Sequence, residues 1–148
     1  MYSEENILIY EGSFFSDKKE GFGTMYNFKG KLFYKGSFKN DMFHGKGLLY
    51  FSNTENSTNT TTELQRQSCV EFDGEFYQNK KHGFGILYYQ NGNIAYQGHF
   101  QNNCFSGEGT SYFKNGKVNY DGYFLNGCRQ GYGVAWRIQT FWNTETNI

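Results

Sequence analysis

The sequence is poor in several residue types on which common folds depend. It has no proline, two alanines and only 16 leucine, isoleucine and valine residues in a chain of 148. Alanine and leucine are among the residues that most favour helices, so their scarcity argues against a helical protein. So few aliphatic side chains also cannot fill a thick interior at the packing density of proteins. The composition therefore predicts a thin protein rather than a two-layer one.

Net charge and long apolar runs are also absent. The 14 basic and 14 acidic residues cancel, so no overall field attracts a nucleic acid. No stretch approaches the roughly 20 apolar residues of a membrane span. The first ten residues lack the basic and apolar regions of a secretory signal. We therefore expect a cytoplasmic protein in which Cys69, Cys104 and Cys128 are free thiols.

Aromatic residues and glycine are abundant instead. There are 16 phenylalanines, 13 tyrosines, two tryptophans and 19 glycines. Aromatic side chains favour strands, which indicates β-structure. Glycine normally weakens a strand, so its abundance needs a reason. We interpret the glycines as bare backbone on which aromatic rings can lie.

A motif of aromatic-x-Gly-x-Phe occurs five times, and a Gly-x-Gly begins nine residues after each motif glycine. Successive units are 24, 38, 24 and 24 residues apart, so one interval carries a 14-residue insertion. We take the motif residues as the structural core of the repeats: Tyr10, Gly12, Phe14, Tyr34, Gly36, Phe38, Phe72, Gly74, Phe76, Tyr96, Gly98, Phe100, Tyr120, Gly122 and Phe124. The chain is then one domain, 1–148, with repeats near 8–31, 32–51, 70–93, 94–117 and 118–137.

This pattern resembles the MORN (membrane occupation and recognition nexus) repeat family. The resemblance covers residues 8–137 and departs from the family pattern in a few places. Phe72 replaces the first tyrosine of the third unit, and Ser106 and Gln130 stand where His44 and His82 precede their Gly-x-Gly. The resemblance implies a role in cytoskeletal or ciliary assembly, such as a radial-spoke-like or axonemal scaffold. The family name also reflects proposed binding of phosphoinositides.

Each unit reads as a β-hairpin. Alternation along its first half predicts that Leu32, Tyr34, Gly36 and Phe38 share one buried face. Polar runs such as 16–20 and 78–82 predict the hairpin turns, and Asn-Gly pairs at 91–92 and 115–116 predict turns between units. The predicted fold is all-β: a single-layer antiparallel meander of about ten strands, elongated, twisted and open at both ends.

No catalytic, metal or cofactor site emerges from the pattern. The Gly-x-Gly pairs lack the third glycine and the βαβ context of a nucleotide-binding loop. His44 and His82 occupy one repeat column, which places them about 10 Å apart, too far to share a zinc ion. Cys104 and Cys128 are likewise too far apart for a disulfide. We expect a protein that is not an enzyme.

Further aromatic columns suggest a partner surface. Tyr26, Tyr50, Tyr88, Tyr112 and Trp136 form one column, and Phe51, Tyr89 and Phe113 form another. Both faces of the predicted sheet are therefore apolar, and a single layer cannot bury both. Either the rings pack on themselves, or a partner covers one face. We expect protein partners in a larger multi-subunit assembly, with self-association possible and no nucleic acid. The location that the resemblance implies is the cytoskeleton or a cilium.

Two alternatives remain open. The lysine pairs 18–19 and 80–81, expected at turn tips, would suit a peripheral membrane module that binds phosphoinositide lipids. The chain could also be a regulatory subunit of an enzyme complex.

The low-complexity insertion 52–69 is expected to be a loop without a packed role, or a finger that a partner orders. Its glycosylation patterns at Asn56 and Asn59 are expected to stay unmodified. The segment 138–148 is expected to cap the last hairpin through Phe141 and Trp142.

Overall fold

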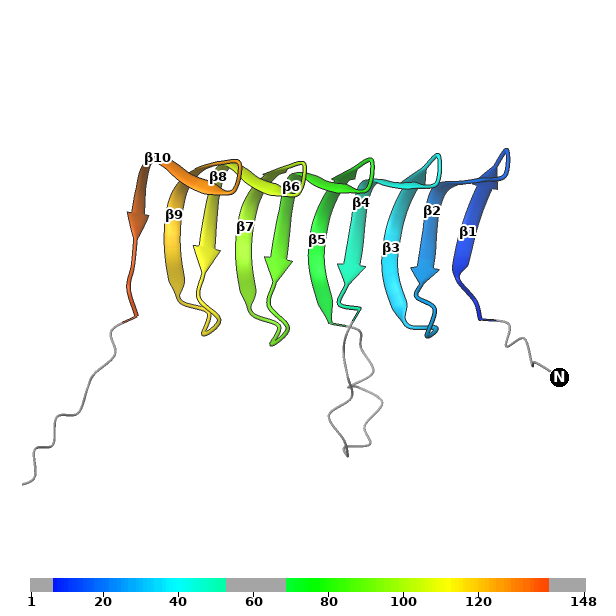
Figure 1. The fold of residues 1–148 in the computed structure, drawn as a ribbon, viewed down its shortest axis with the longest axis horizontal. Coiled ribbons are helices and arrows are strands. Elements are labelled where there is room, and N and C mark those ends of the chain that lie inside the picture. The colour runs from blue at the N-terminus through cyan, green and yellow to red at the C-terminus, as the bar shows by residue number, and fades with distance from the viewer. Residues whose placement is uncertain (1–6, 53–68, 139–148) are drawn as a thin grey trace, which may run out of the picture.

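In the computed structural model, residues 7–52 and 69–138 are described, and they form one open antiparallel sheet (Figure 1). The ten strands are β1 Tyr10–Phe15, β2 Lys18–Tyr26, β3 Leu32–Lys39, β4 Met42–Tyr50, β5 Val70–Tyr77, β6 Lys80–Tyr88, β7 Ile94–Gln101, β8 Cys104–Tyr112, β9 Val118–Leu125 and β10 Cys128–Ala135. They lie side by side in sequence order. The predicted all-β, single-layer meander is confirmed.

Helices are absent from the described part of the chain, so none there could cross a membrane. The predicted insertion, apart from its end residues Ser52 and Cys69, lies outside the described residues, as does the predicted cap beyond Ile138.

Two-residue turns join the strands of each hairpin. Both turn residues have left-handed backbone, as at Asn102 and Asn103, with φ of 50° and 72°. Such turns match the right-handed twist of the flanking strands, and Asn, Asp and Gly tolerate them best. The turns are shorter than the polar runs suggested. Lys18 and Lys80 are already the first residues of β2 and β6, so the lysine pairs lie within strands and not at turn tips.

Short turns built on asparagine join successive hairpins. The side-chain oxygen of Asn27 accepts backbone N–H groups of Lys29 and Lys31 at 2.9 and 3.0 Å. Gly30 follows with φ of 70°, a conformation that glycine adopts without cost. The predicted turns at 91–92 and 115–116 are confirmed, with the same backbone hydrogen bonds closing each.

The β4–β5 junction shows that pairing between hairpins does not depend on such a turn. Residues 53–68 separate these strands, yet their register repeats the other junctions. The matching pairs are Tyr50–Val70, Gly47–Gly74 and Gly45–Phe76 here, and Tyr26–Leu32, Gly23–Gly36 and Gly21–Phe38 between β2 and β3. The register therefore does not depend on the short turn.

A β-bulge at each hairpin junction breaks the expected alternation. Met25 pairs with Tyr34, but the next residue, Tyr26, pairs with Leu32, so Phe33 is the extra residue. Because paired residues of antiparallel strands share a face, Leu32 lies on the face of Tyr26 and not on that of Tyr34. The prediction that Leu32 shares the buried aromatic face is therefore wrong, and the inserted residue is the reason.

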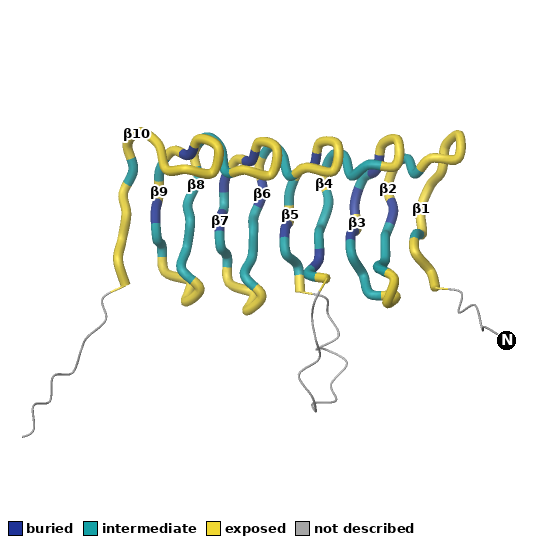
Figure 2. Tube along the Cα trace, in the orientation of Figure 1, coloured by how far each residue is buried: buried dark blue, intermediate teal, exposed yellow. Residues whose placement is uncertain are grey.

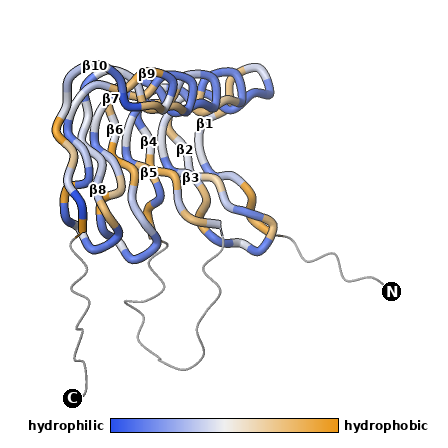
Figure 3. The backbone as a smooth tube through the Cα atoms, turned by 60° about the vertical axis from the view of Figure 1, so that its left-hand side comes forward, coloured by the Kyte–Doolittle hydropathy of each residue, from blue (hydrophilic) through white to orange (hydrophobic). Residues whose placement is uncertain are grey.

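The strands also bend toward one face. The rings of Tyr34 and Phe38 meet edge to face with centroids 5.2 Å apart, although four residues of straight strand span about 13 Å. A register shift between Gly36 and Phe38 marks the bend, and Figure 3 shows the hairpin ends turned to one side. We call the side inside the bend the inner face and the other side the outer face.

The core is a row of rings on the inner face. Its buried members are Tyr34, Phe38, Phe72, Phe76, Tyr96, Phe100, Tyr120 and Phe124. Burial is concentrated on the interior strands, whereas β1 and β10 are largely exposed (Figure 2). The sheet is a single layer, so no second sheet covers this row of rings. The side chains that lie on the rings therefore form the surface of the inner face.

Candidate functional site

The floor of the inner face is aromatic because glycine makes room for it. The Tyr34 ring lies across Gly36 and Gly47, which pair between β3 and β4. A Cβ atom on Gly36 would lie 2.6 Å from the Tyr34 Oη, and one on Gly47 would lie 2.6 Å from Cε2. These separations are well below van der Waals contact. Each of the other hairpins places a ring over a glycine pair in the same way.

Rings of neighbouring hairpins contact one another and make the row continuous. Each contact is edge to face, the geometry that aromatic pairs prefer. The centroid distances are 5.1 Å for Tyr10–Phe38, 5.3 Å for Tyr34–Phe76, 5.0 Å for Phe72–Phe100 and 5.3 Å for Tyr96–Phe124. The motif residues of the interior hairpins are thus buried, and they support the surface rather than form it.

A second layer of side chains covers these rings and forms the surface itself. We call its members the lid residues: Lys19, Phe43, Lys81, Phe105 and Arg129, each nine residues after the ring it covers. Phe43 and Phe105 stack on Tyr34 and Tyr96 at 3.8 Å. The cations lie over Tyr10, Phe72 and Tyr120 at 5.6, 5.3 and 4.7 Å. Cations and phenylalanines therefore alternate along the array, and sequence inspection missed this column.

At three of the four junctions the bulge residue contacts the lid residue of its hairpin and matches its chemistry. Phe33 contacts Phe43 with ring centroids 6.2 Å apart. The Lys81 ammonium forms an ion pair with Glu71 at 2.8 Å. In the last hairpin, Arg129 donates to the side-chain oxygen of Asn119 at 3.0 Å. The bulges therefore build the inner surface, because they add one side chain per hairpin to it.

The buried phenols are structural. The hydroxyls of Tyr34 and Tyr96 donate to the carbonyl oxygens of Ser37 and His99 at 3.0 Å. Burial raises the pKa of the Tyr34 phenol well above its ordinary value and raises the pKa of Tyr96 to about 12. Both phenols therefore stay protonated near neutral pH and act as hydrogen-bond donors.

The predicted tyrosine column lies on the outer face. Tyr26, Tyr50, Tyr88 and Tyr112 pair with Leu32, Val70, Ile94 and Val118, so each ring has an aliphatic neighbour. Burial and then the charge of Asp73 raise the pKa of Tyr50 and Tyr88. Trp136, just after β10, is exposed.

The second predicted column follows the strands. Phe51, Tyr89 and Phe113 are half-buried at the ends of the hairpins, and the Tyr89 hydroxyl donates to the carbonyl oxygen of Tyr112 at 2.8 Å. The structure thus divides the predicted partner-binding residues of the strands and turns between the outer face and the hairpin ends. It places none of Tyr26, Tyr50, Tyr88 and Tyr112 on the inner face.

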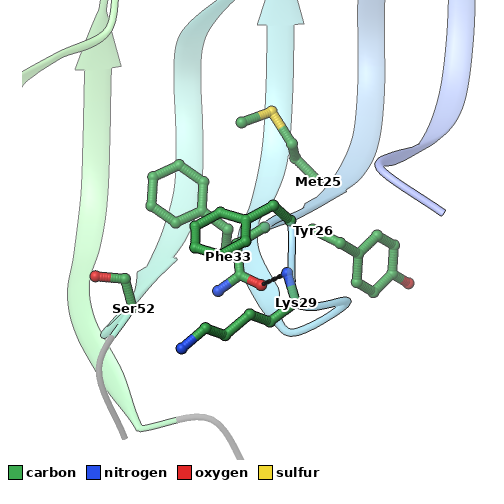
Figure 4. Close-up of a pocket in the computed structure, with 7 residues that line it drawn as sticks. Met25, Tyr26, Lys29, Phe33 and Ser52 are labelled. Atoms are coloured by element: carbon green, nitrogen blue, oxygen red, sulfur yellow. Dashed lines mark hydrogen bonds between the residues drawn. The ribbon is translucent and has the colours of Figure 1, made fainter. Parts of the chain in front are cut away.

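A cavity of about 350 Å³ opens at the N-terminal part of the inner face. Met25, Phe28 and Phe33 give it an apolar wall, and Lys29 and Ser52 lie at its rim (Figure 4). The Tyr26 ring points away from Met25 and Phe33 in that view. The cavity could receive an apolar side chain of a bound segment.

The remaining candidates are separate from this surface. The Tyr77 ring lies between His44 and His82, with centroids 5.2 and 5.7 Å away. Cys69, Cys104 and Cys128 are free and exposed. Within residues 7–52 and 69–138, no cluster of three or more metal-binding side chains occurs.

Comparison with known proteins agrees with the architecture. The MORN repeat family model matches residues 10–31, 34–54, 72–94, 96–118 and 120–137, which is more than half of the chain. No curated protein matches the chain significantly. Five matches, one on each hairpin of the sheet, place the chain in the MORN repeat family, a family of repeat-based binding modules.

Proposed function

We propose that the protein is a non-enzymatic scaffold that docks a segment of a partner protein along its inner face, within a cytoskeletal or ciliary assembly. The observation that carries this proposal is the row of lid residues. They stand on a continuous aromatic floor on the open side of a single-layer sheet. Their setting in such an assembly rests on the family resemblance alone.

The chemistry of the inner face suits a polypeptide. Aromatic residues and arginine are enriched at the centres of protein interfaces, where large rigid groups gain contact at little entropic cost. Phe43 and Phe105 offer ring surface and Arg129 offers a positive charge, whereas Lys19 and Lys81 are paired with Asp41 and Glu71. The fitting partner segment therefore presents apolar side chains to the two phenylalanines.

The outer face is less suitable at its centre. Beside the glycine pairs it carries polar residues, and Thr110 donates its hydroxyl proton to Asp121 at 2.9 Å. Phe22 and Phe84 also lie on this face and are exposed. Lys35 and Asp73 are exposed there. Polar cross-strand pairs of this kind satisfy one another, so covering that part of the outer face would cost desolvation.

Phosphoinositide binding has less support. The second lysine of each pair is already engaged, since Lys19 forms an ion pair with Asp41 at 3.5 Å and Lys81 forms one with Glu71. The first lysines of the two pairs, Lys18 and Lys80, are exposed and lie on hairpins two repeats apart. Two distant lysines give about 2 kcal/mol of attraction to an anionic surface.

Site-specific photo-crosslinking in the source cells tests the face. A photoreactive phenylalanine analogue replaces Leu49 or Leu87, which lie on the inner face, or their neighbours Leu48 and Ile86, which lie on the outer face. We expect the inner-face positions to give a crosslinked protein and the adjacent outer-face positions to give none. Crosslinks from the outer-face positions alone would contradict the proposal. The proposal would also be contradicted if neither inner-face position crosslinked to protein and the protein bound phosphoinositide vesicles at physiological salt.

A further inference from the structure

The two edges of the sheet are incomplete. In the part of the chain that the structure describes, β1 pairs only with β2, and β10 pairs only with β9. Phe14 on β1 is 61% exposed, whereas Phe38 in the same repeat position is 3% exposed. Trp136 is 46% exposed, whereas its counterpart Tyr50 is 9% exposed. Edge strands with apolar side chains and free backbone groups are templates for another strand.

The two edges are also of complementary kinds. β1 is the first strand of a hairpin and β10 is the second, and all four internal junctions pair a second strand with a first strand. The register of those junctions can be carried over. It sets Gly133 opposite Gly12, Ala135 opposite Tyr10 and Trp136 opposite Leu8 of another copy, by analogy with Gly23–Gly36, Met25–Tyr34 and Tyr26–Leu32.

A junction of this kind does not need the short turn that joins the other hairpins. β4 and β5 keep the common register although residues 53–68 replace the short turn between them. The surfaces of the strands therefore supply the specificity, and two separate copies present the same surfaces.

Aromatic packing would be completed at such a junction. At each internal junction the motif phenylalanine of one hairpin contacts the ring of the hairpin before it, as Phe124 contacts Tyr96 at 5.3 Å. Tyr120 has no such neighbour from a following hairpin within the described residues, and Phe14 has none from a preceding one. Phe14 of a second copy would lie against Tyr120.

Charge is complementary at the same place. At the β2–β3 junction the Asp41 side chain accepts the backbone N–H of Lys19 at 2.9 Å, and it forms an ion pair with the Lys19 ammonium at 3.5 Å. Arg129 stands in the repeat position of Lys19, and Asp17 stands in that of Asp41. The other internal junctions have Asn79, Asn103 or Gly127 at this turn position. A β10–β1 junction would therefore repeat the one charged internal junction.

We infer that a second copy of this chain adds to the C-terminal edge of the sheet, with its β1 antiparallel to β10 in the register of the internal junctions. The contact joins the β10 edge of one copy to the β1 edge of the other. The pair therefore still has one free β1 edge and one free β10 edge. Such head-to-tail contacts generate open filaments when the rotation between copies does not close. This contact uses the sheet edges, so it leaves the inner face free for the proposed partner.

Sedimentation of the full chain over a range of concentrations tests the contact. We expect the average mass to rise with concentration beyond that of a dimer. Phe14→Ser should weaken association at least tenfold. Phe15→Ser is the matched control and should not, because Phe15 is on the same strand but its repeat position is exposed in every hairpin. A mass that stays monomeric for the wild type overturns the inference.

A charge exchange separates this contact from symmetric pairing of like edges. Asp17→Arg and Arg129→Asp should each weaken self-association, since each sets like charges together at the junction. An equal mixture of the two variants should recover it, because every mixed junction then joins opposite charges. Fraying of an altered turn cannot be rescued by mixing. A closed dimer that persists in both variants, or a mixture no better than its components, overturns the head-to-tail arrangement. Circular dichroism checks that each variant keeps its sheet.

Discussion

Replacing Gly109 by alanine tests the idea that the fold depends on rings lying on bare backbone. Gly109 on β8 pairs with Gly98 on β7, and the Tyr96 ring covers it. An added Cβ would lie 2.5 Å from Cζ and 2.7 Å from Cε2 of that ring. The ring cannot retreat easily, because Phe105 stacks on its other side at 3.8 Å.

The size of the effect follows from what the ring must give up. Overpacking a well-filled site costs about 1–3 kcal/mol. Displacing the ring also weakens its stack on Phe105, worth about 0.5–1.5 kcal/mol. It lengthens the hydrogen bond from the Tyr96 hydroxyl to the His99 carbonyl, worth about 1 kcal/mol. We expect the free energy of unfolding to fall by about 3–5 kcal/mol, a large part of the 5–15 kcal/mol typical of a domain.

Gly133→Ala in the last hairpin is the matched comparison. Its Cβ would meet Tyr120 in the same way, but there the cover is the exposed side chain of Arg129. We expect it to cost about 1–2 kcal/mol less, since a flexible cation can move aside. Denaturant titration followed by circular dichroism measures both, and hydrogen exchange shows which strands open. Equal costs for the two variants, or unchanged stability in Gly109→Ala, would refute the ring-on-backbone model.

Three further predictions concern single features. The Tyr96 phenol ionises near pH 10 when unfolded and near pH 12 when folded, so stability should be level below pH 10 and fall as the pH rises toward 12. Near-ultraviolet phenolate absorbance and circular dichroism follow this. The double exchange Glu71→Ala with Lys81→Phe installs the residues that the fourth hairpin has at these positions, Ala95 and Phe105. It should change the free energy of unfolding by no more than about 1 kcal/mol. Lys81→Phe alone should cost about 1–2 kcal/mol more, because it leaves Glu71 without its ion-pair partner. Gly127→Asn should stabilise by about 1 kcal/mol, because its amide oxygen can accept the N–H of Phe105. Chemical denaturation measures both.

The first of these fails if Tyr96 ionises together with exposed tyrosines while the sheet persists. The second fails if the double exchange is as costly as the single one. The third fails if the exchange rate of the Phe105 amide hydrogen does not slow.

The repeat architecture could be predicted because it depends on short-range patterns. The spacing of Tyr34, Gly36 and Gly47 specifies a ring and the bare backbone beneath it, and turn residues such as Asn91 and Gly92 specify where a hairpin ends. These signals are local, and five copies reinforce them. The number of strands and the all-β character of residues 7–52 and 69–138 therefore followed from the sequence.

The composition of the inner surface could not be predicted in the same way. One extra residue at each bulge moves every side chain beyond it to the other face, and strict alternation gives no sign of it. Phe33 and Leu32 therefore exchanged faces relative to expectation. The lid residues escaped notice because Lys81 and Phe105 look unrelated in a motif, although both cover a ring in the same position.

The alternation of lid residues doubles the period of the binding surface. Groups of one chemical kind return every second hairpin, which is four strands or about 19 Å along the array. A helix lying along the row would present equivalent side chains about every 13 residues, and an extended segment about every six. A ligand can therefore be sought by its own sequence spacing, with apolar residues recurring at that interval to meet Phe43 and Phe105.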